Sequence, residues 1–419
     1  MDETTAVSVV VIAAAAVLAP LLAELLRRWR VPSVLFELLL GILVGPAVLG
    51  WVEVDKFISG LSQFGMAILF FMAGYEIDFA KVRGDPIKRG LAGWAIALVL
   101  GLGVGVVLSL SGFVVSSLLI GLALTTTTVG ALLPMLKDRR LLATPFGSFL
   151  SASGAIGEFG PILAITILLS AASPIRESFL LIVFAVVAVC VATVASRPQP
   201  PTIIAMMQRN LSTSTQLPVR IVLLLVAIMV AVAGQLGLDN LLGAFAAGLI
   251  ARLALSAKES AALLPRLESI GFGFLIPVFF IVSGVSFDLD SLLESSSTLL
   301  KVPLFLALML VVRGLPGLLV YHGLLTLRER TALSVLQATA LPLLVVITQI
   351  GLDTDRMRPS NAAALVGAGM LSVLVFPLVG FAILGAERTP AGSDADSTSG
   401  VTSDDPDVGE SESLGGIID

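Results

Sequence analysis

The sequence has very few of the side chains that build disulfides and metal clusters. Among its 419 residues there are one cysteine, one histidine and two tyrosines. A disulfide framework needs paired cysteines, and structural metal sites combine Cys and His at short, recognisable spacings, so the sequence excludes both kinds of site. The single cysteine, Cys190, lies inside an apolar run, which predicts a small buried core residue.

Charged side chains are also scarce, at 13% of the residues against roughly 25% in an average soluble domain. Hydrophobic residues make up 57% of the chain, and its mean hydropathy is +1.02. This composition excludes a soluble globular protein and predicts a polytopic membrane protein. The acidic residues concentrate after residue 386, in a stretch too polar to bury a core. We therefore predict a transmembrane domain over residues 1–385 and a disordered acidic tail over 386–419.

Long apolar runs fill the first 385 residues. A helix needs about 17 to 25 mostly apolar residues to cross the bilayer. The sequence contains thirteen runs of about this length, and it therefore predicts an all-α protein with about thirteen transmembrane helices. The runs centre on residues 5–26, 33–51, 58–79, 88–110, 114–136, 146–170, 177–196, 218–236, 239–256, 264–286, 299–324, 329–351 and 360–385.

The loops between these runs alternate in basic charge. Nineteen Lys and Arg residues follow odd-numbered runs, and five follow even-numbered runs. Because cytoplasmic loops carry the excess of Lys and Arg, we expect the N-terminus outside and the C-terminus in the cytoplasm. One basic residue, Arg313, lies in the middle of the eleventh run.

Two parts of the chain resemble each other. The third run contains FGMAILFFMAGYEIDF and the tenth contains FGFLIPVFFIVSGVSFDL, so that Gly74 and Asp78 match Gly284 and Asp288 at one offset of 210 residues. The tenth run comes an odd number of helices after the third, so the two copies run in opposite directions. This pattern is typical of inverted-topology repeats. The expected extents are about 5–170 for the first repeat, about 177–196 for a linker helix and about 218–385 for the second repeat.

Two runs at corresponding positions of the repeats carry residues that weaken a helix. The fifth contains ALTTTTVGALLPMLKD, and the twelfth contains QATALPLLVVITQIG, with Pro342 at mid-depth. Interrupted helices at matching positions are typical of transporter binding sites near the membrane midplane. The alternative is that Thr and Pro only kink packed helices.

Glu158 lies in the middle of the sixth run, in SASGAIGEFGPILA. A charge at the bilayer centre costs roughly 2.5 to 3.5 kcal/mol on insertion scales, which favours a functional role. Gly160 and Pro161 leave carbonyl groups nearby without their usual helical donor, and Ser153 is a candidate oxygen ligand one to two turns earlier. These oxygens suit a hard cation, while a desolvated acid takes up a proton, so we predict a site that holds one or the other. The alternative is a structural ion pair with Arg313.

Two further titratable residues receive structural interpretations. Glu37 lies near the start of the second run beside Pro32, which favours a structural or interfacial role. His322 falls near the cytoplasmic end of the eleventh run, and we expect an interfacial residue of no special function.

Four motifs together resemble the second group of monovalent cation:proton antiporters, which includes sodium/proton exchangers and the membrane domain of potassium-efflux systems. They are VPSVLFELLLGILVGPAVLG, FGMAILFFMAGYEIDF, LDNLLGAFAAGLI and FLIPVFFIVSGVSFDL, and the resemblance covers about residues 5–385. It implies a core domain of helices four to six and eleven to thirteen, with crossing broken helices. This core would move against a dimerisation domain of helices one to three and eight to ten, in a homodimer with alternating access.

The resemblance also implies a set of site residues. Thr126 and Thr127 correspond to the unwound fifth helix, Glu158 stands where the family has its essential Asp, and Arg313 stands at a basic position. The family usually has a second polar residue directly before that Asp, where this chain has Gly157. A monovalent cation is expected at Glu158, with Arg313 compensating charge.

The expected function is secondary active antiport of Na⁺ or K⁺ against H⁺ across the cell membrane. We expect no enzymatic activity, no cofactor and no nucleic-acid partner. Because only one carboxylate lies at the depth of Glu158, one proton for one cation is the simplest exchange. Two alternatives stay open: a passive cation channel, and a sensor that keeps the fold without transporting ions.

Overall fold

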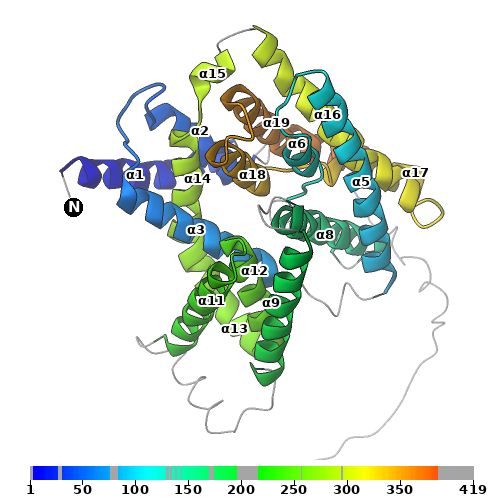
Figure 1. The fold of residues 1–419 in the computed structure, drawn as a ribbon, viewed down its shortest axis with the longest axis horizontal. Coiled ribbons are helices and arrows are strands. Elements are labelled where there is room, and N and C mark those ends of the chain that lie inside the picture. Colours follow the sequence, from blue (N-terminus) through cyan, green and yellow to red (C-terminus); the bar gives the residue numbers. More distant parts are fainter. Residues whose placement is uncertain are drawn as a thin grey trace, which may run out of the picture. The chain divides into compact units, whose positions relative to one another are not determined.

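A computed structural model of the chain gives the fold shown in Figure 1. It describes residues 3–26, 31–75, 84–128, 132, 135–136, 139–142, 144–168, 174–195, 216–255, 257–293 and 296–385. The chain divides into two units, Met1–Leu384 and Gly385–Asp419, and every helix below belongs to the first. The predicted disordered tail, 386–419, lies outside the described residues.

The first unit is helical, and no β-strand occurs within the described ranges. In chain order the helices are α1 (Glu3–Leu25), α2 (Ser33–Val44), α3 (Lys56–Tyr75), α5 (Asp85–Leu110), α6 (Ser117–Leu124), α8 (Pro145–Leu168), α9 (Pro174–Ala195), α11 (Leu217–Gln235), α12 (Asn240–Ala254), α13 (Ala257–Ile270), η2 (Gly271–Leu275), α14 (Ile276–Val285), α15 (Leu289–Leu293), α16 (Ser296–Val320), α17 (Leu327–Leu336), α18 (Pro342–Asp353) and α19 (Pro359–Leu384). Each predicted run contains at least one of them, which confirms an all-α membrane fold with about thirteen spans.

The two predicted interruptions are present. The fifth span begins as α6 and leaves the helix at Thr125, where the hydroxyls of Thr125 and Thr126 donate to the carbonyls of Leu122 and Ala123 at 2.8 and 2.7 Å. The twelfth span is split into α17 and α18 by a non-helical link over residues 337–341. Pro342 opens α18, where its missing N–H costs no helical hydrogen bond.

The tenth span contains a third irregularity. α13 continues through the π turn η2 into α14. The turn ends two residues before Pro277, which has no N–H to donate to the carbonyl four residues earlier, and the helix widens there instead of breaking.

The helices pack into two groups, which correspond to the expected core and dimerisation domains (Figure 1). The core group comprises α5, α6, α8, α16, α17, α18 and α19. The second group, which we call the dimerisation group after the role expected from the sequence, comprises α1, α2, α3, α11, α12, α13 and α14. α9, the predicted linker helix, contacts α12 in one group and α8 in the other.

The two inverted repeats exchange partners within the dimerisation group. α3 packs against α12 of the second repeat, and α2 packs against α14. The contacts centre on Gly74 and Gly248 in the first pair and on Gly41 and Gly284 in the second. A methyl group built on any of these four would lie 2.1 to 2.3 Å from a carbonyl oxygen of the facing helix. Gly74 and Gly284, which the sequence comparison matches, thus make equivalent contacts with a carbonyl oxygen of the facing helix. Asp78, the residue matched to Asp288, lies outside the described residues.

The prediction that Cys190 is buried was wrong, because Cys190 is exposed on α9. The same helix also exposes Ile182, Val186 and Val189. A membrane helix presents apolar residues to lipid as well as to its neighbours, so apolar surroundings in the sequence do not imply burial.

Glu37, for which the sequence favours a structural or interfacial role, is buried within the protein. Its side chain in α2 is only 4% exposed, its carboxyl is hydrogen-bonded by Ser33, and its Oε2 has no hydrogen-bond partner among the described residues. Glu37 is the fifth residue of α2, and α1 and α14 pack against this helix. His322 is exposed just after α16, and its interfacial position stays a prediction.

Candidate functional site

The extended segments of the two interrupted helices cross and bond to each other. The N–H of Thr128 donates to the carbonyl oxygen of Thr339 at 2.8 Å, and the N–H of Leu341 donates to the hydroxyl of Thr128 at 3.0 Å. The hydroxyl of Thr127 donates to the carbonyl of Gln337. These bonds satisfy backbone groups that interrupted helices leave without partners, so one crossing joins the two repeats.

Helix α8, which carries Glu158, is bonded to this crossing. Pro161 has no N–H, so the carbonyl of Gly157, four residues earlier, lacks its usual helical donor. The N–H of Thr127 donates to this carbonyl at 3.0 Å and takes the missing place. The carbonyl that Pro161 leaves without its helical donor, as predicted, therefore holds the Thr segment beside the turn of α8 that carries Glu158, whose side chain is partly buried.

Arg313 on α16 is buried, with 1% of its surface exposed. Its Nε donates to the Thr127 hydroxyl at 2.8 Å, and its Nη2 donates to the Ser153 carbonyl at 3.2 Å and reaches the Ser153 hydroxyl at 3.5 Å. A guanidinium keeps its charge when buried and needs such oxygen acceptors. Arg313 thus joins α16 to α8 and to the crossing.

Gln337, at the end of α17, is a site residue that the sequence interpretation missed. Its Oε1 accepts from the Ser153 hydroxyl at 2.6 Å, and its Nε2 donates to the Arg313 carbonyl. The side chain is 2% exposed, so both ends of a buried amide are bonded and connect α8, α16 and α17. The sequence signal that could have identified Gln337 is its polar amide at the start of QATALP, inside an apolar run.

The structure brings three of the predicted site residues into contact with one another. Thr127, Ser153 and Arg313 belong to one hydrogen-bonded cluster, and Glu158 directly follows the Gly157 carbonyl that Thr127 binds. Thr126 lies in the same extended segment, 2% exposed. The cation-binding roles of these residues stay predictions.

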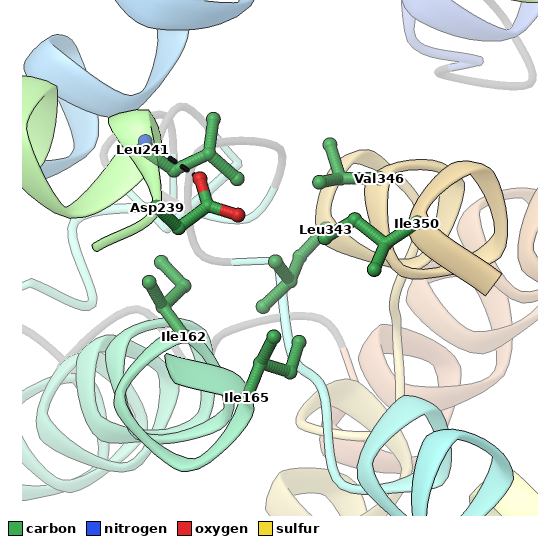
Figure 2. Close-up of a pocket in the computed structure, with 7 residues that line it drawn as sticks. All are labelled: Ile162, Ile165, Asp239, Leu241, Leu343, Val346 and Ile350. Atoms are coloured by element: carbon green, nitrogen blue, oxygen red, sulfur yellow. Dashed lines mark hydrogen bonds between the residues drawn. The ribbon is translucent and has the colours of Figure 1, made fainter. Parts of the chain in front are cut away.

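A small pocket lies beside the crossing (Figure 2). Its lining residues come from α8, α18 and the start of α12; they are Ile162, Ile165, Leu343, Val346, Ile350, Asp239 and Leu241. Ile162 and Ile165 follow Glu158 by four and seven residues, so they lie on its face of α8 one and two turns away. Asp239 caps α12 by accepting from the Leu241 N–H at 2.9 Å, and its carboxylate faces the pocket.

Comparison with known proteins places the chain among membrane transporters. The family model described as sodium/hydrogen exchanger, transmembrane, matches residues 13–385. The Bacillus subtilis protein YjbQ is 27% identical over 398 residues, which are 90% of this chain but 63% of YjbQ. The chain therefore spans less than two thirds of that relative. The Na⁺/H⁺-K⁺ antiporter GerN of Bacillus cereus is 27% identical over 278 residues, 64% of this chain and 69% of GerN.

A solved structure shares the fold. The sodium proton antiporter MjNhaP1 from Methanocaldococcus jannaschii superposes with a TM-score of 0.64 at 16% sequence identity. The match covers 92% of this chain and 99% of that one. At this identity the likeness concerns architecture.

Proposed function

Because the chain belongs to the transmembrane sodium/hydrogen exchanger family, we propose that it is a secondary active antiporter that exchanges Na⁺ or K⁺ for H⁺ by alternating access. It would work as a homodimer in the cell membrane, with the N-terminus outside. The observation that carries the proposal is the bond from Thr127 to the Gly157 carbonyl, which holds the crossing of two interrupted helices against the turn of Glu158. The name of GerN supports both Na⁺ and K⁺ as candidate cations.

Glu158 is the proposed carrier. A carboxylate in an apolar bundle is stabilised either by a proton or by a bound cation, and one occupant excludes the other. Binding of a cation from one side therefore releases a proton, and reprotonation on the other side releases the cation. This competition is sufficient for coupled exchange by a single group.

The proposed cation ligands differ in how many acceptor positions they keep. A hydroxyl has one donor and two acceptor positions. Thr127 uses its donor on Gln337 and one acceptor position on Arg313, whereas Thr126, among the described residues, uses only its donor, on Ala123. The hydroxyl of Thr126 thus keeps more of its acceptor capacity for a cation than that of Thr127.

The pocket is the proposed access route. Its apolar walls run along the Glu158 face of α8, and Asp239 supplies the carboxylate among its lining residues. A negative charge between low-dielectric walls raises the local concentration of cations. With the N-terminus outside, as proposed, this end of α12 would lie on the outer side of the membrane.

Purified protein in proteoliposomes tests the proposal. Proton movement is followed with a pH-sensitive dye while Na⁺, K⁺ and Li⁺ are added in turn. Wild type should exchange at least one cation for protons, and Glu158→Gln should insert and fold but lose coupled exchange. Glu53→Gln, a matched change at an exposed position, serves as the control and should keep it.

Each alternative function has its own outcome in this assay. A channel would carry cation current without a proton gradient. A non-transporting sensor would move no ions as wild type, and Glu158→Gln would alter only its stability. Retained pH-dependent exchange in Glu158→Gln would refute the carrier role.

A further inference from the structure

The rings of Phe159 and Phe245 stack across the boundary between the two groups of helices. Phe159 lies on α8 of the core group, and Phe245 lies on α12 of the dimerisation group. Their ring centroids are 4.3 Å apart, and their planes are inclined by 15°. At this separation the two ring faces are in van der Waals contact and leave no room for water between them.

Other ring pairs join residues of one group. The rings of Phe113 and Phe305, both in the core group, have centroids 6.4 Å apart, and Phe279 and Phe280 are neighbours on α14. A pair within one group keeps its geometry when the groups move relative to each other. The Phe159–Phe245 pair joins the two groups and must then part.

Each ring of this pair is carried by a backbone that is fixed within its own group. A methyl group built on Gly160, the residue after Phe159, would lie 2.5 Å from Cε2 of Trp94, so α8 packs closely on α5 at this point. A methyl group built on Gly74 would lie 2.3 Å from the carbonyl oxygen of Phe245, so α12 packs closely on α3. The contact between the rings therefore depends on the position of one group against the other.

The stack lies at one end of the small pocket shown in Figure 2. On α8, Phe159 lies one turn before Ile162, which lines the pocket. On α12, Phe245 lies one turn after Leu241, which also lines it. The two helices thus run in opposite directions along the pocket. Asp239, at the start of α12, lies at the end away from the rings.

We propose that Phe159 and Phe245 form an apolar seal between Glu158 and the side of the membrane opposite the pocket, and that exchange requires the stack to part. The proposal rests on the proposed antiport and adds what keeps it coupled. An ion gives up water only where polar groups replace it, and two ring faces offer none. With the stack closed, Glu158, directly before Phe159, is reached from the pocket side alone. Movement of the core group separates the rings and opens the other side.

Phe245→Ala tests the seal. Wild type should move cations and protons in a fixed ratio, measured in the same proteoliposomes with a radioactive cation and a pH-sensitive dye. Phe245→Ala should lose the fixed ratio and let one ion cross without the other. Phe305→Ala is the matched control, because it removes an equally buried ring whose partner, Phe113, lies in the same group. The control should also melt at a lower temperature but keep the wild-type ratio.

Two outcomes of this comparison would overturn the proposal. One is an unchanged ratio in Phe245→Ala protein that folds and inserts. The other is an equal loss of the ratio in Phe305→Ala, which would assign the effect to general loosening of the bundle.

Cross-linking tests whether the stack must part, and it also serves where Phe245→Ala fails to fold. Phe159→Cys and Phe245→Cys are combined in a Cys190→Ser chain and bridged with a short bis-methanethiosulfonate, which dithiothreitol removes again. Bridging should abolish exchange of the cation, and reduction should restore it. Bridging Phe113→Cys to Phe305→Cys within the core group is the control and should leave exchange unchanged. Exchange that continues across a complete bridge between 159 and 245 would refute the required parting.

Failure of the proposed function gives a different result, since the wild-type chain then exchanges no cation. The seal is then measured in the Cys190→Ser chain by the access of Ag⁺, a soft monovalent cation that binds thiols. From the pocket side, Ag⁺ should reach Ile162→Cys. It should reach Ala155→Cys, one turn before Phe159, only when Phe245→Ala is also present. Equal access to Ala155→Cys with and without the ring of Phe245 would reject the seal.

Discussion

Pro161 connects the sequence to the geometry of the site through one missing hydrogen bond. It frees the carbonyl of Gly157, and the N–H of Thr127 binds there. The bond forms between groups of the backbone, so it needs no particular side chain at 127. The Thr127 hydroxyl is thereby left to Gln337 and Arg313.

Arg313 should contribute to both stability and pH dependence. Arg313→Ala removes the donors to Thr127 and Ser153, and each buried acceptor left without a donor costs about 1 to 3 kcal/mol. We expect a lower melting temperature in detergent and a shifted pH profile of exchange. Arg313→Lys should be milder, because its ammonium can still reach an oxygen. An Arg313→Ala protein that melts and responds to pH as wild type would contradict this.

Asp239 should affect cation entry. Asp239→Asn keeps the oxygen that accepts from Leu241, and Asn caps a helix as well as Asp does, so α12 should stay intact. Loss of the charge should raise the apparent KM for Na⁺ about threefold at low salt, with little change at high salt, where the charge is screened. Flux assays at two ionic strengths measure this.

Asp288→Asn is the control for Asp239. Asp288 is exposed and accepts from the N–H of Ser291 at 2.8 Å, so it caps a helix in the same way outside the pocket. Equal KM shifts in the two variants would show a general surface-charge effect, and no shift in Asp239→Asn would exclude the access role.

At the scale of elements, a single carboxylate ties α1 to the start of α3. Asp55 accepts from the Ile58 N–H at 2.8 Å and from the Thr5 hydroxyl. These bonds, the amide first, lower the pKa of Asp55 below its usual 3.8. A carboxyl whose pKa is lowered by folding stabilises the fold above that usual value, and the stabilisation is lost as the pH falls through the native pKa.

We therefore expect the α1–α3 contact to loosen only in acid, below about pH 4. Fluorescence of Trp51, in the segment before α3, measures the loosening during an acid titration. The Asp55→Asn variant should show no such transition. The Thr5→Val variant should still show part of it, because its Asp55 keeps the hydrogen bond from the Ile58 N–H. An identical acid transition in Asp55→Asn would contradict the assignment.

The helix interruptions were predictable from sequence, whereas their partners were not. Thr runs and prolines act on the backbone within a few residues, so their effects at 125–128 and before Pro342 follow from local chemistry. Gln337 and the acceptors of Arg313 depend on which helices meet, and neighbours along the chain do not specify that. The prediction that Cys190 is buried failed for a related reason. Apolar residues face lipid as well as protein, so the sequence around Cys190 does not show which of the two it contacts.

At the scale of the whole molecule, the number of titrating groups sets the electrical character of transport. Glu158 is the acid at mid-depth of the described core helices, whose other acids, Asp85, Glu329 and Asp353, lie at helix ends. Arg313 keeps its charge throughout. One proton against one monovalent cation moves no net charge, so we expect electroneutral exchange.

Imposed voltage tests this expectation. A membrane potential contributes about 2.3 kcal/mol per charge per 100 mV to an electrogenic step and nothing to an electroneutral one. Na⁺-driven proton movement should keep the same rate under a valinomycin-set potential, and solid-supported membranes should show no net-charge current. A clear voltage dependence would mean that a second group such as Glu37, buried in α2, also titrates.

The glycine contacts that pair α3 with α12, and α2 with α14, have a consequence for the synthesis and membrane insertion of the chain. Gly248 is synthesised roughly 170 residues after Gly74, and at about 5 to 20 residues per second this takes on the order of ten seconds or more. During that interval α3 is already in the bilayer, with its glycine face turned to lipid or to the insertion machinery. The first half of this protein must wait in the membrane, incompletely folded, until the second half arrives to close it.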